Sequence, residues 1–321
     1  MCHKPKGYVV RKAEDGDVAE FDDHRDHLIG VAYRMLGSRA DAEDAVQDVW
    51  LRYASADHDE IRDLRAWLTT ATARICLDVL RSARVRREAY QGPWLPEPFL
   101  TRPDESSVDP GEHAVRREEV SYALLVVMEN LTPEQRVAFV LHDVFAVPFD
   151  EIASVLGTSD AAARQLASRA RRAVAGAAPR HTTDHGEQRR ILEAFAAAAE
   201  HGDLDGLLAV LAPDVVTVGD GGGVAPAARH PITGAVQVAR FMAGLFRRTA
   251  KEAAKIVAEP VLVNGDLGLL IEVTIPSLGV QRMVMALAYA DGRITAIYNQ
   301  LNPAKLSGVP APDPERSLPL P

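Results

Sequence analysis

The chain has 321 residues, of which 47% are hydrophobic and 25% charged, and its formal net charge is -9. This length exceeds that of one ordinary domain, and the apolar content excludes a disordered chain. No apolar run approaches the roughly 20 residues that span a bilayer, and no apolar leader precedes a cleavage site. We therefore expect a soluble cytoplasmic protein without membrane contact. The two cysteines, Cys2 and Cys76, lack the spacing of a disulfide framework or a zinc site.

The net charge hides a segregation of acidic and basic residues along the sequence. Acids gather in residues 14–23 and 41–48, whereas arginines gather in residues 81–87 and 164–172. The distribution matters more than the sum for partners, because local fields attract or repel them. The negative total therefore does not exclude nucleic-acid binding.

Residues 21–90 predict a compact helical domain that follows a flexible extension, residues 1–20. Apolar residues recur at steps of three and four in three runs, near residues 28–35, 45–50 and 64–80. Gly37 breaks the first run, and either Ser38 or Asp41 can cap the second. Trp67 falls within the third apolar run, so we expect it in the core.

Residues 91–112 predict a linker, because they contain five prolines and little periodicity. A flexible spacer would be rich in Gly and Ser. This segment instead carries Trp94, Leu95, Phe99 and Leu100, which are costly to leave in water. We therefore expect another part of the protein to dock on it.

A second helical domain is predicted for residues 113–178. Thr132, Pro133 and Gln135 form the signature of a capping box with proline in the first helical turn. Residues 149–172 then predict a helix-turn-helix, in which Gly157 permits the turn and Ser159 caps the second helix.

The outer face of that second helix carries small and forked polar side chains. Such side chains can enter the major groove, where Arg and Gln read base edges and further arginines contact phosphates. The alternative is the solvated face of an ordinary helical hairpin. The coincidence of apolar face, turn glycine, cap and basic face favours DNA binding. The predicted DNA-binding residues of this helix are Ala161, Arg164, Gln165, Ser168, Arg169 and Arg172.

After a short linker, residues 179–186, the pattern changes to α+β over residues 187–306. Helices are predicted at 188–200, 204–211 and 235–248, and strand runs at 215–218, 255–263, 267–275, 282–289 and 294–301. Asn264-Gly265 and Asp291-Gly292 have the chemistry of hairpin turns. We expect an antiparallel sheet curled around helices. Residues 307–321, with five prolines, predict a disordered tail.

These features together resemble the extracytoplasmic-function RNA polymerase sigma factors that carry a C-terminal SnoaL-like extension. The resemblance spans about residues 21–306. It implies two all-α helical domains, the second with the helix-turn-helix, followed by an α+β SnoaL-like cone. The helix-turn-helix matches the family's reader of the upstream (-35) promoter element. The expected partners are the clamp of core RNA polymerase and promoter DNA, and no cofactor is expected.

The resemblance also assigns residues in the first helical domain. Residues 41–52 resemble the family's helix that binds the polymerase clamp, and residues 65–81 resemble the segment that melts and holds the downstream (-10) element. The implied polymerase-binding residues are Asp41, Glu43, Asp44, Gln47, Asp48 and Arg52. The implied DNA-binding residues are Arg74, Asp78, Arg81 and Arg84. The loop of residues 55–63 is a better candidate than Trp67 for a pocket that holds a flipped base.

Three short motifs narrow the resemblance to members with the extension. The WLPEP linker motif is present, whereas the DGGGK-type motif ends in Val224 and the NPDKL-type motif has Ala304 in place of the aspartate. In this family the extension docks on the linker and replaces a separate anti-sigma factor, so none is expected. The implied interdomain residues are Trp94, Leu95, Pro96, Glu97, Pro98, Asp220, Gly221, Gly222, Gly223, Asn302, Pro303, Lys305 and Leu306.

Two further readings remain open. The SnoaL-like fold also occurs in isomerases, whose chemistry needs a carboxylate base and an oxyanion donor in an apolar site. The available candidates are Asp220, His230, Glu272, Tyr289 and Tyr298.

A stand-alone DNA-binding regulator with a ligand-sensing domain is the alternative to a sigma factor, but it needs no acidic 41–48 helix. His24 and His27 have a possible zinc spacing, yet we assign no metal and expect no enzyme.

Overall fold

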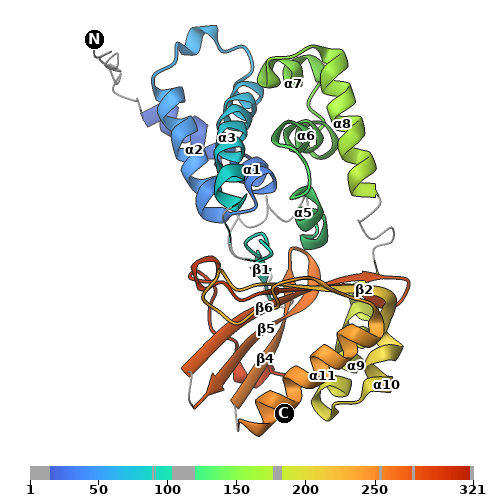
Figure 1. Ribbon diagram of the computed structural model, residues 1–321. Coiled ribbons are helices and arrows are strands. Elements are labelled where there is room, and N and C mark those ends of the chain that lie inside the picture. Colours follow the sequence, from blue (N-terminus) through green and yellow to red (C-terminus); the bar gives the residue numbers. More distant parts are fainter. Residues whose placement is uncertain are drawn as a thin grey trace, which may run out of the picture. The chain divides into compact units, whose positions relative to one another are not determined.

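The computed structural model describes residues 15–88, 90, 92–102, 120–175, 183–252, 255–276 and 279–318. The chain divides into two compact units (Figure 1). The first unit comprises residues 1–85, 109–118 and 131–173, and the second comprises residues 86–108, 119–130 and 174–321. No helix in these described ranges combines the length and apolar character needed to cross a bilayer.

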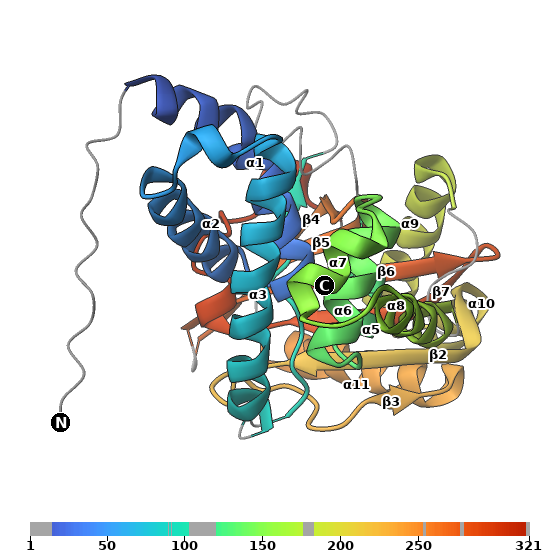
Figure 2. The same cartoon turned by 90° about the horizontal axis from the view of Figure 1, so that it is seen from above.

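The N-terminal part of the first unit consists of three long helices and one short 3-10 turn. They are α1 (Asp15–Leu36), α2 (Arg39–Ala54), η1 (His58–Glu60) and α3 (Leu64–Glu88), and α1 to α3 pack side by side (Figures 1 and 2). Ser38 is the N-cap of α2, accepting a hydrogen bond from the Asp41 amide. Because α1 begins at Asp15, residues 15–20 are helical rather than part of a flexible extension. Residues 1–14 lie outside the described chain.

The rest of the first unit contains the helix-turn-helix. Its elements are α6 (Pro133–Phe139), the π-helical turn η2 (Val140–Val144), α7 (Phe149–Leu156) and α8 (Asp160–Ala175). The predicted capping box is confirmed, because the Thr132 side chain accepts from the Gln135 amide while the Gln135 side chain accepts from the Thr132 amide. Arg136 is 3% exposed and donates a 3.0 Å hydrogen bond to the Met35 carbonyl, which joins α6 to α1.

The second unit is built on a seven-stranded sheet in the order β1-β4-β5-β6-β7-β2-β3. Turns at Asn264-Gly265 and Asp291-Gly292 close the β4-β5 and β6-β7 hairpins, and all four residues have positive φ, as such turns require. The strands are β1 (Leu100–Thr101), β2 (Leu211–Asp220), β3 (Ile232–Thr233), β4 (Lys255–Val263), β5 (Asp266–Ile275), β6 (Gly279–Ala290) and β7 (Arg293–Gln300).

The predicted antiparallel sheet is wrong in one pairing, because β2 and β7 run parallel. Hairpins join antiparallel strands, whereas parallel neighbours need a long crossover connection. Residues 221–292 supply that connection, since they include α11 (Ala235–Lys251) and the intervening strands. The fold class itself, two helical sigma domains and an α+β domain, is confirmed.

Both faces of the sheet are covered. Met285, Leu287 and Tyr289 belong to a core shared with α9 (His185–His201), α10 (Leu204–Val210) and α11. The alternate residues of β6, including Val284 and Ala286, belong to a second core. Since successive strand residues point to opposite faces, these cores lie on the two sides of the sheet.

The second core includes residues from outside the 187–306 segment. Its members include Leu95 from the linker and Tyr122 from α5 (Tyr122–Met128). Helix α5 therefore belongs to the sheet's unit, although residues 113–178 were expected to form one domain. The end of the linker adds a strand to the sheet, because β1 pairs with β4. Packing on the sheet removes the apolar side chains of the linker from water, which is favourable. Residues 103–119 and 176–182 lie outside the described chain.

The described tail, residues 307–318, is packed rather than disordered. It contains the 3-10 turn η4 (Pro314–Arg316), and the Leu318 amide donates to the Ala258 carbonyl of β4. The Asp313 amide donates to Glu259, which is 1% exposed. Prolines remove donors but leave extended chain that can still pair at a sheet edge, and the composition alone misses this.

We expect Thr132→Ala to destabilise the first unit by about 1 kcal/mol, because the Gln135 amide loses its capping acceptor. Urea unfolding followed by helical circular dichroism measures the change. Thr158→Ala is the matched control, since Thr158 is an exposed turn residue. Equal midpoints for the two variants would show that the capping box contributes nothing.

Candidate polymerase, DNA and linker-binding sites

The helix-turn-helix presents a basic outer face. Ala163, Ala167 and Ala170 of α8 are buried within the first unit. Gly157 ends α7 with φ 65°, and Ser159 accepts from the Ala162 amide to start α8. All six predicted DNA-binding residues are exposed: Ala161, Arg164, Gln165, Ser168, Arg169 and Arg172.

Two arginines of α8 are oriented by neighbouring side chains. The Arg164 guanidinium lies 4.6 Å from the centre of the Phe149 ring, a cation-π contact. Arg171 donates to Asp143 at 2.6 Å, which ties α8 to η2. Arg171 is therefore occupied within the fold, whereas Arg164, Arg169 and Arg172 retain exposed guanidinium groups at the helix surface.

Helix α2 presents an acidic face with an apolar residue in it. Asp44, Gln47 and Asp48 are exposed, and the helix buries Ala45, Val46 and Val49 on the opposite side. Leu51, which was not predicted, is 59% exposed on the same side as Asp44 and Asp48. The sequence signal that could have identified Leu51 is its position three residues after Asp48 and seven after Asp44, on the same side of the helix.

The other predicted residues of α2 lie around this face. Asp41 is exposed in the first turn, and Arg52 is exposed in the last. Glu43 forms an i,i+4 ion pair with Arg39 at 2.9 Å and lies toward a different side of the helix. The structure thus groups Asp41, Asp44, Asp48 and Arg52 with Leu51, and it separates Glu43 from them.

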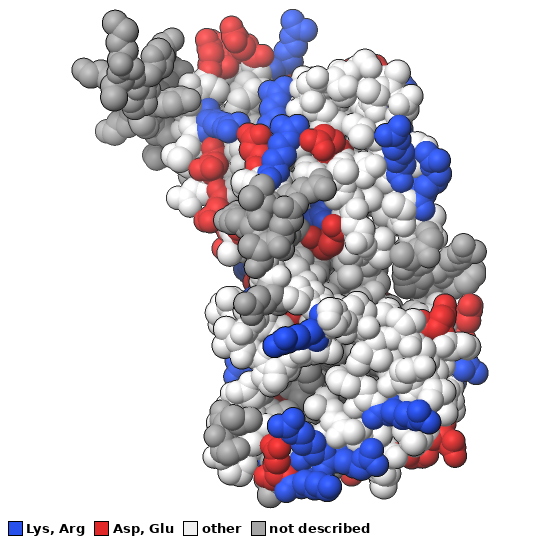
Figure 3. Space-filling model, viewed as in Figure 1, with Lys and Arg blue, Asp and Glu red and all other residues white. Residues whose placement is uncertain are grey.

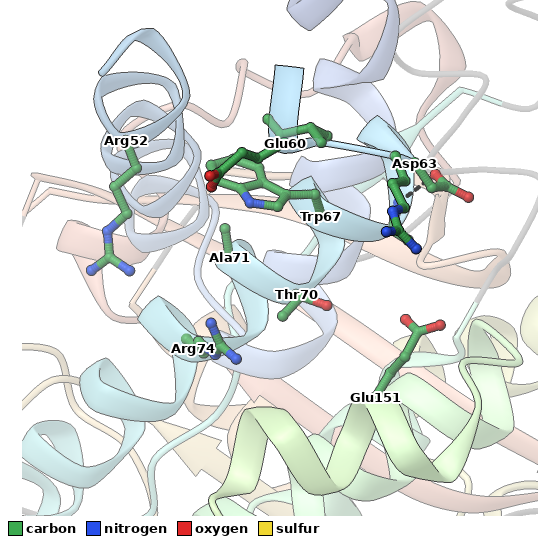
Figure 4. A pocket seen from close by; sticks show the side chains of 11 residues that line it. Arg52, Glu60, Asp63, Trp67, Thr70, Ala71, Arg74 and Glu151 are labelled. Atoms are coloured by element: carbon green, nitrogen blue, oxygen red, sulfur yellow. Dashed lines mark hydrogen bonds between the residues drawn. The ribbon is translucent and has the colours of Figure 1, made fainter. Parts of the chain in front are cut away.

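A pocket of about 550 Å³ lies where α2, the η1 loop and α3 meet (Figure 4). Trp67 is half-buried and lines this pocket, so it is not the core residue that its apolar run suggested. Arg52 and Arg74 contribute cations to the pocket, and Glu151 points toward it from α7. An aromatic side chain beside arginines suits an unstacked base and its phosphate.

Two of the four α3 residues predicted to bind DNA already have partners in α6 and α7. Arg74 donates to the Ser154 hydroxyl of α7 at 3.0 Å. Arg81 donates twice to one carboxylate oxygen of Glu134 in α6, at 3.1 and 3.0 Å. Burial opposes ionisation of Glu134, but a backbone hydrogen bond and the Arg81 guanidinium outweigh it and lower the pKa of this carboxyl. Asp78 is exposed, and the Arg84 side chain lies outside the described residues.

His27 is engaged in a hydrogen-bond chain rather than free to bind a metal. Arg65 donates to Nδ1 at 3.3 Å, so Nε2 carries the proton and donates to the Thr69 hydroxyl at 3.1 Å. Burial and the nearby positive charges, of which Arg65 contributes most, together lower the pKa of His27 to about 4. In the part of the chain that the structure describes, no three His, Cys, Asp or Glu residues gather as a metal site.

The linker is fastened to the sheet by one buried carboxylate. Asp220, at the end of β2, is fully buried and accepts hydrogen bonds from the Leu95 amide at 2.9 Å and the Tyr90 hydroxyl at 2.5 Å. The Gly222 amide donates at 3.0 Å. Burial and the hydrogen bond to Asp220 raise the pKa of Tyr90 well above its ordinary value. Neither Tyr90 nor its role is signalled by the motifs.

Lys305 supplies the positive charge that this carboxylate needs. Its Nζ lies 2.7 Å from an Asp220 oxygen and also donates to the Leu95 carbonyl. The same ammonium lies 3.9 Å from the centre of the Trp94 ring, a close cation-π contact. Trp94 itself is half-buried, whereas Leu95 is fully buried, so Leu95 is the apolar anchor of the linker.

Further hydrogen bonds hold the linker backbone along the sheet. Gln300 donates to the carbonyls of Leu95 and Pro96, and the Tyr122 hydroxyl donates to Pro96 at 2.7 Å. Beyond them, Phe99 and Asn264 exchange two hydrogen bonds, of 3.0 and 2.8 Å. Pro98 is buried, and Glu97 is half-buried. Gln300 and Tyr122 were missed because nothing local distinguishes them from core polar residues.

Three family models match the chain in order: Sigma-70 region 2 at residues 21–86, Sigma-70 region 4 at residues 121–174, and a SnoaL-like domain at residues 192–297. The chain is 46% identical over 302 residues to the ECF RNA polymerase sigma factor SigJ of Mycobacterium tuberculosis, covering 92% of this chain and 94% of that protein. The chain belongs to the ECF sigma factors.

Other relatives agree with this membership. The probable ECF RNA polymerase sigma factor SigI of M. tuberculosis is 35% identical over 285 residues, covering 88% of this chain and 92% of that protein. The crystal structure of M. tuberculosis SigJ superposes with a TM-score of 0.74 at 43% identity, covering 91% of this chain and 99% of the other. As an ECF sigma factor, the chain is a transcription factor that binds core RNA polymerase and promoter DNA.

Both motif departures lie at or near the linker site of this sigma factor. Val224, at the lysine position of the DGGGK-type motif, is 80% exposed, so Lys305 alone neutralises Asp220 among the described cations. The Ala304 amide donates to the Asn302 side chain. A Cβ on Gly222, whose φ is 63°, would lie 2.5 Å from Asn302, so only glycine fits there. Pro303 and Leu306 frame the same turn.

The isomerase candidates are not brought together in this sigma factor. Asp220 is occupied by the linker, and Glu272 is paired with Arg282 at 2.8 Å. Tyr289 and Tyr298 belong to cores on opposite sides of the sheet. His230 is exposed. These residues therefore form no joint acid–base site.

Asp220→Asn is expected to release the linker, because it leaves Lys305 buried without a counter-charge. Breaking such a pair costs about 3–5 kcal/mol. We expect faster chymotryptic cleavage after Trp94 and Phe99, measured by mass spectrometry of timed digests. The matched control is Glu272→Gln, which removes a less buried ion pair from the same sheet. Wild-type cleavage rates for Asp220→Asn would contradict this account of the linker site.

Proposed function

We propose that this sigma factor binds the polymerase clamp through α2, reads the upstream promoter element with α8 and holds the melted downstream element at α3. We further propose that the C-terminal unit, meaning the SnoaL-like domain within the second unit, regulates it in cis, in place of a separate anti-sigma factor. The observation that carries the regulatory part is the fastening of the linker by Asp220 and Lys305. The C-terminal unit has no catalytic part in this function.

The α2 face fits a basic partner with an apolar contact. Asp44 and Asp48 provide charges that guide association, and Leu51 provides apolar area that is otherwise exposed to water. Arg52 lies at the boundary between this face and the pocket. Polymerase and DNA would then meet on adjoining surfaces of one domain.

Helix α3 cannot bind DNA fully in the arrangement described. Arg81 is occupied by Glu134, Arg74 by Ser154, and the carboxylate of Glu151 faces the pocket. DNA phosphates carry the same charge as these carboxylates, so binding requires α6 and α7 to move away from α3. The arrangement in which α6 and α7 contact α3, here called closed, is therefore the inactive one.

The C-terminal unit acts on this step through the linker. Only residues 89–94 separate the end of α3 from the anchored Leu95. A fastened linker shortens the free connection between the two sigma domains and so restricts their separation. Release of Asp220 from the linker favours the open, active arrangement.

Asp44→Arg and Asp48→Arg are each expected to weaken binding to core polymerase by about tenfold or more, since like charges then face each other. Fluorescence anisotropy with labelled protein measures this affinity, and unchanged helical circular dichroism confirms the fold. Asp59→Arg is the control, because Asp59 is exposed on η1, away from this face. An equal loss in all three variants would point to general electrostatics rather than to α2.

Run-off transcription on a promoter recovered by selection tests the whole proposal. Initiation should require both core polymerase and this protein, and Asp220→Asn should raise the yield severalfold while Glu272→Gln should not. DNA binding without core-dependent initiation would favour a stand-alone regulator. Initiation with an unchanged or lower yield for Asp220→Asn would reject inhibition through the linker.

A further inference from the structure

Helix α11 has an exposed basic face that the linker site does not use. Its 17 residues include four basic side chains, Arg240, Arg247, Arg248 and Lys251, and no acid. All four are exposed. In Figure 3 Lys and Arg side chains gather over the part of the second unit where Figure 1 draws α11. This concentration stands out in a chain whose net charge is -9.

The fold does not require these charges. The inner side of α11 packs into the sheet core through Val238, Ala239 and Met242. Arg248 pairs with Glu252 at 3.0 Å, with the arginine side chain 74% exposed. Within the described ranges, Arg240 and Arg247 have no ion-pair partner. By comparison, the exposed side of α9 balances its two arginines with acids, including Glu187 and Glu193.

The arrangement of side chains around α11 favours a polyanion over a protein as the binding partner of this face. At about 100° per residue, the four basic side chains fall within an arc of roughly 100°. The exposed apolar residues Val236, Phe241 and Leu245, at 44%, 36% and 43% exposure, fall toward its edges. Protein interfaces have the opposite arrangement, with charged residues depleted at the centre. A basic stripe along a helix is the footprint of phosphate contacts.

We propose that the α11 basic face, Arg240, Arg247, Arg248 and Lys251, binds the phosphate backbone of duplex promoter DNA next to the element read by α8. This inference rests on the proposed function, because that function brings the protein to DNA. Nine residues, 176–184, separate α8 from α9, and they span at most about 30 Å. The second unit therefore stays near the duplex whenever α8 occupies the groove, and the tether gives α11 a high effective concentration there.

The test is the salt dependence of DNA binding by the full-length protein. Each phosphate contact contributes about 0.9 to the slope of log K against log salt concentration. Arg240→Gln/Arg247→Gln should lower that slope by about 1.8 and weaken binding about tenfold or more at moderate salt. Fluorescence anisotropy with a labelled promoter duplex measures both. Arg189→Gln/Arg190→Gln makes the same charge change on α9 and should alter neither, since those arginines lie outside the α11 face.

The outcomes separate this inference from the proposed function. A slope equal to wild type in the α11 variant would overturn it, as would equal losses in the α9 control. A loss of affinity for core polymerase with an unchanged DNA slope would also overturn it and assign the face to a protein partner. Run-off transcription with core polymerase and the wild-type protein tests the sigma function separately. If no initiation occurred, the comparison of DNA binding between the variants would still be valid.

Discussion

A carboxylate without access to water determines how this protein is assembled. Asp220 is fully buried, and an unpaired buried charge would be too costly to retain. The fold therefore surrounds it with Lys305, the Leu95 and Gly222 amides and the Tyr90 hydroxyl. These partners come from the linker, a glycine turn and the C-terminal segment, so satisfying one charge fixes three distant parts of the chain against the sheet.

The apolar side of the sheet makes the same attachment favourable. One side is covered by α9, α10 and α11, but Val284 and Ala286 on the other side would face water without Leu95 and α5. Apolar burial supplies driving force without direction, whereas the hydrogen bonds to Asp220 and Asn264 fix the register of the linker. The linker thus covers one side of the sheet and is held there in a fixed register.

Local signals made much of the fold predictable from sequence. The capping box at Thr132, the turn at Gly157 and the hairpins at Asn264 and Asp291 depend on residues a few positions apart, and each occurs as expected. The linker strand and the parallel pairing of β2 with β7 depend on contacts across long separations, and alternation patterns do not encode partners. Leu51 and Tyr90 were missed for a related reason, since their roles depend on which neighbours leave them exposed or bury them.

The two sets of contacts differ in strength, and this difference suits a switch. The Arg81–Glu134 pair has side chains 50% and 35% exposed, and such surface pairs contribute about 0–1 kcal/mol and weaken with salt. The Asp220–Lys305 pair has side chains only 0% and 14% exposed, so removing either partner would be far more costly. Under the proposed function, DNA phosphates compete for Arg81 directly, because they replace a weakly held carboxylate with another anion. The linker contact cannot be displaced in this way. In the proposed mechanism it therefore sets how often the sigma domains open, and the exposed pairs determine how readily DNA then replaces region 4.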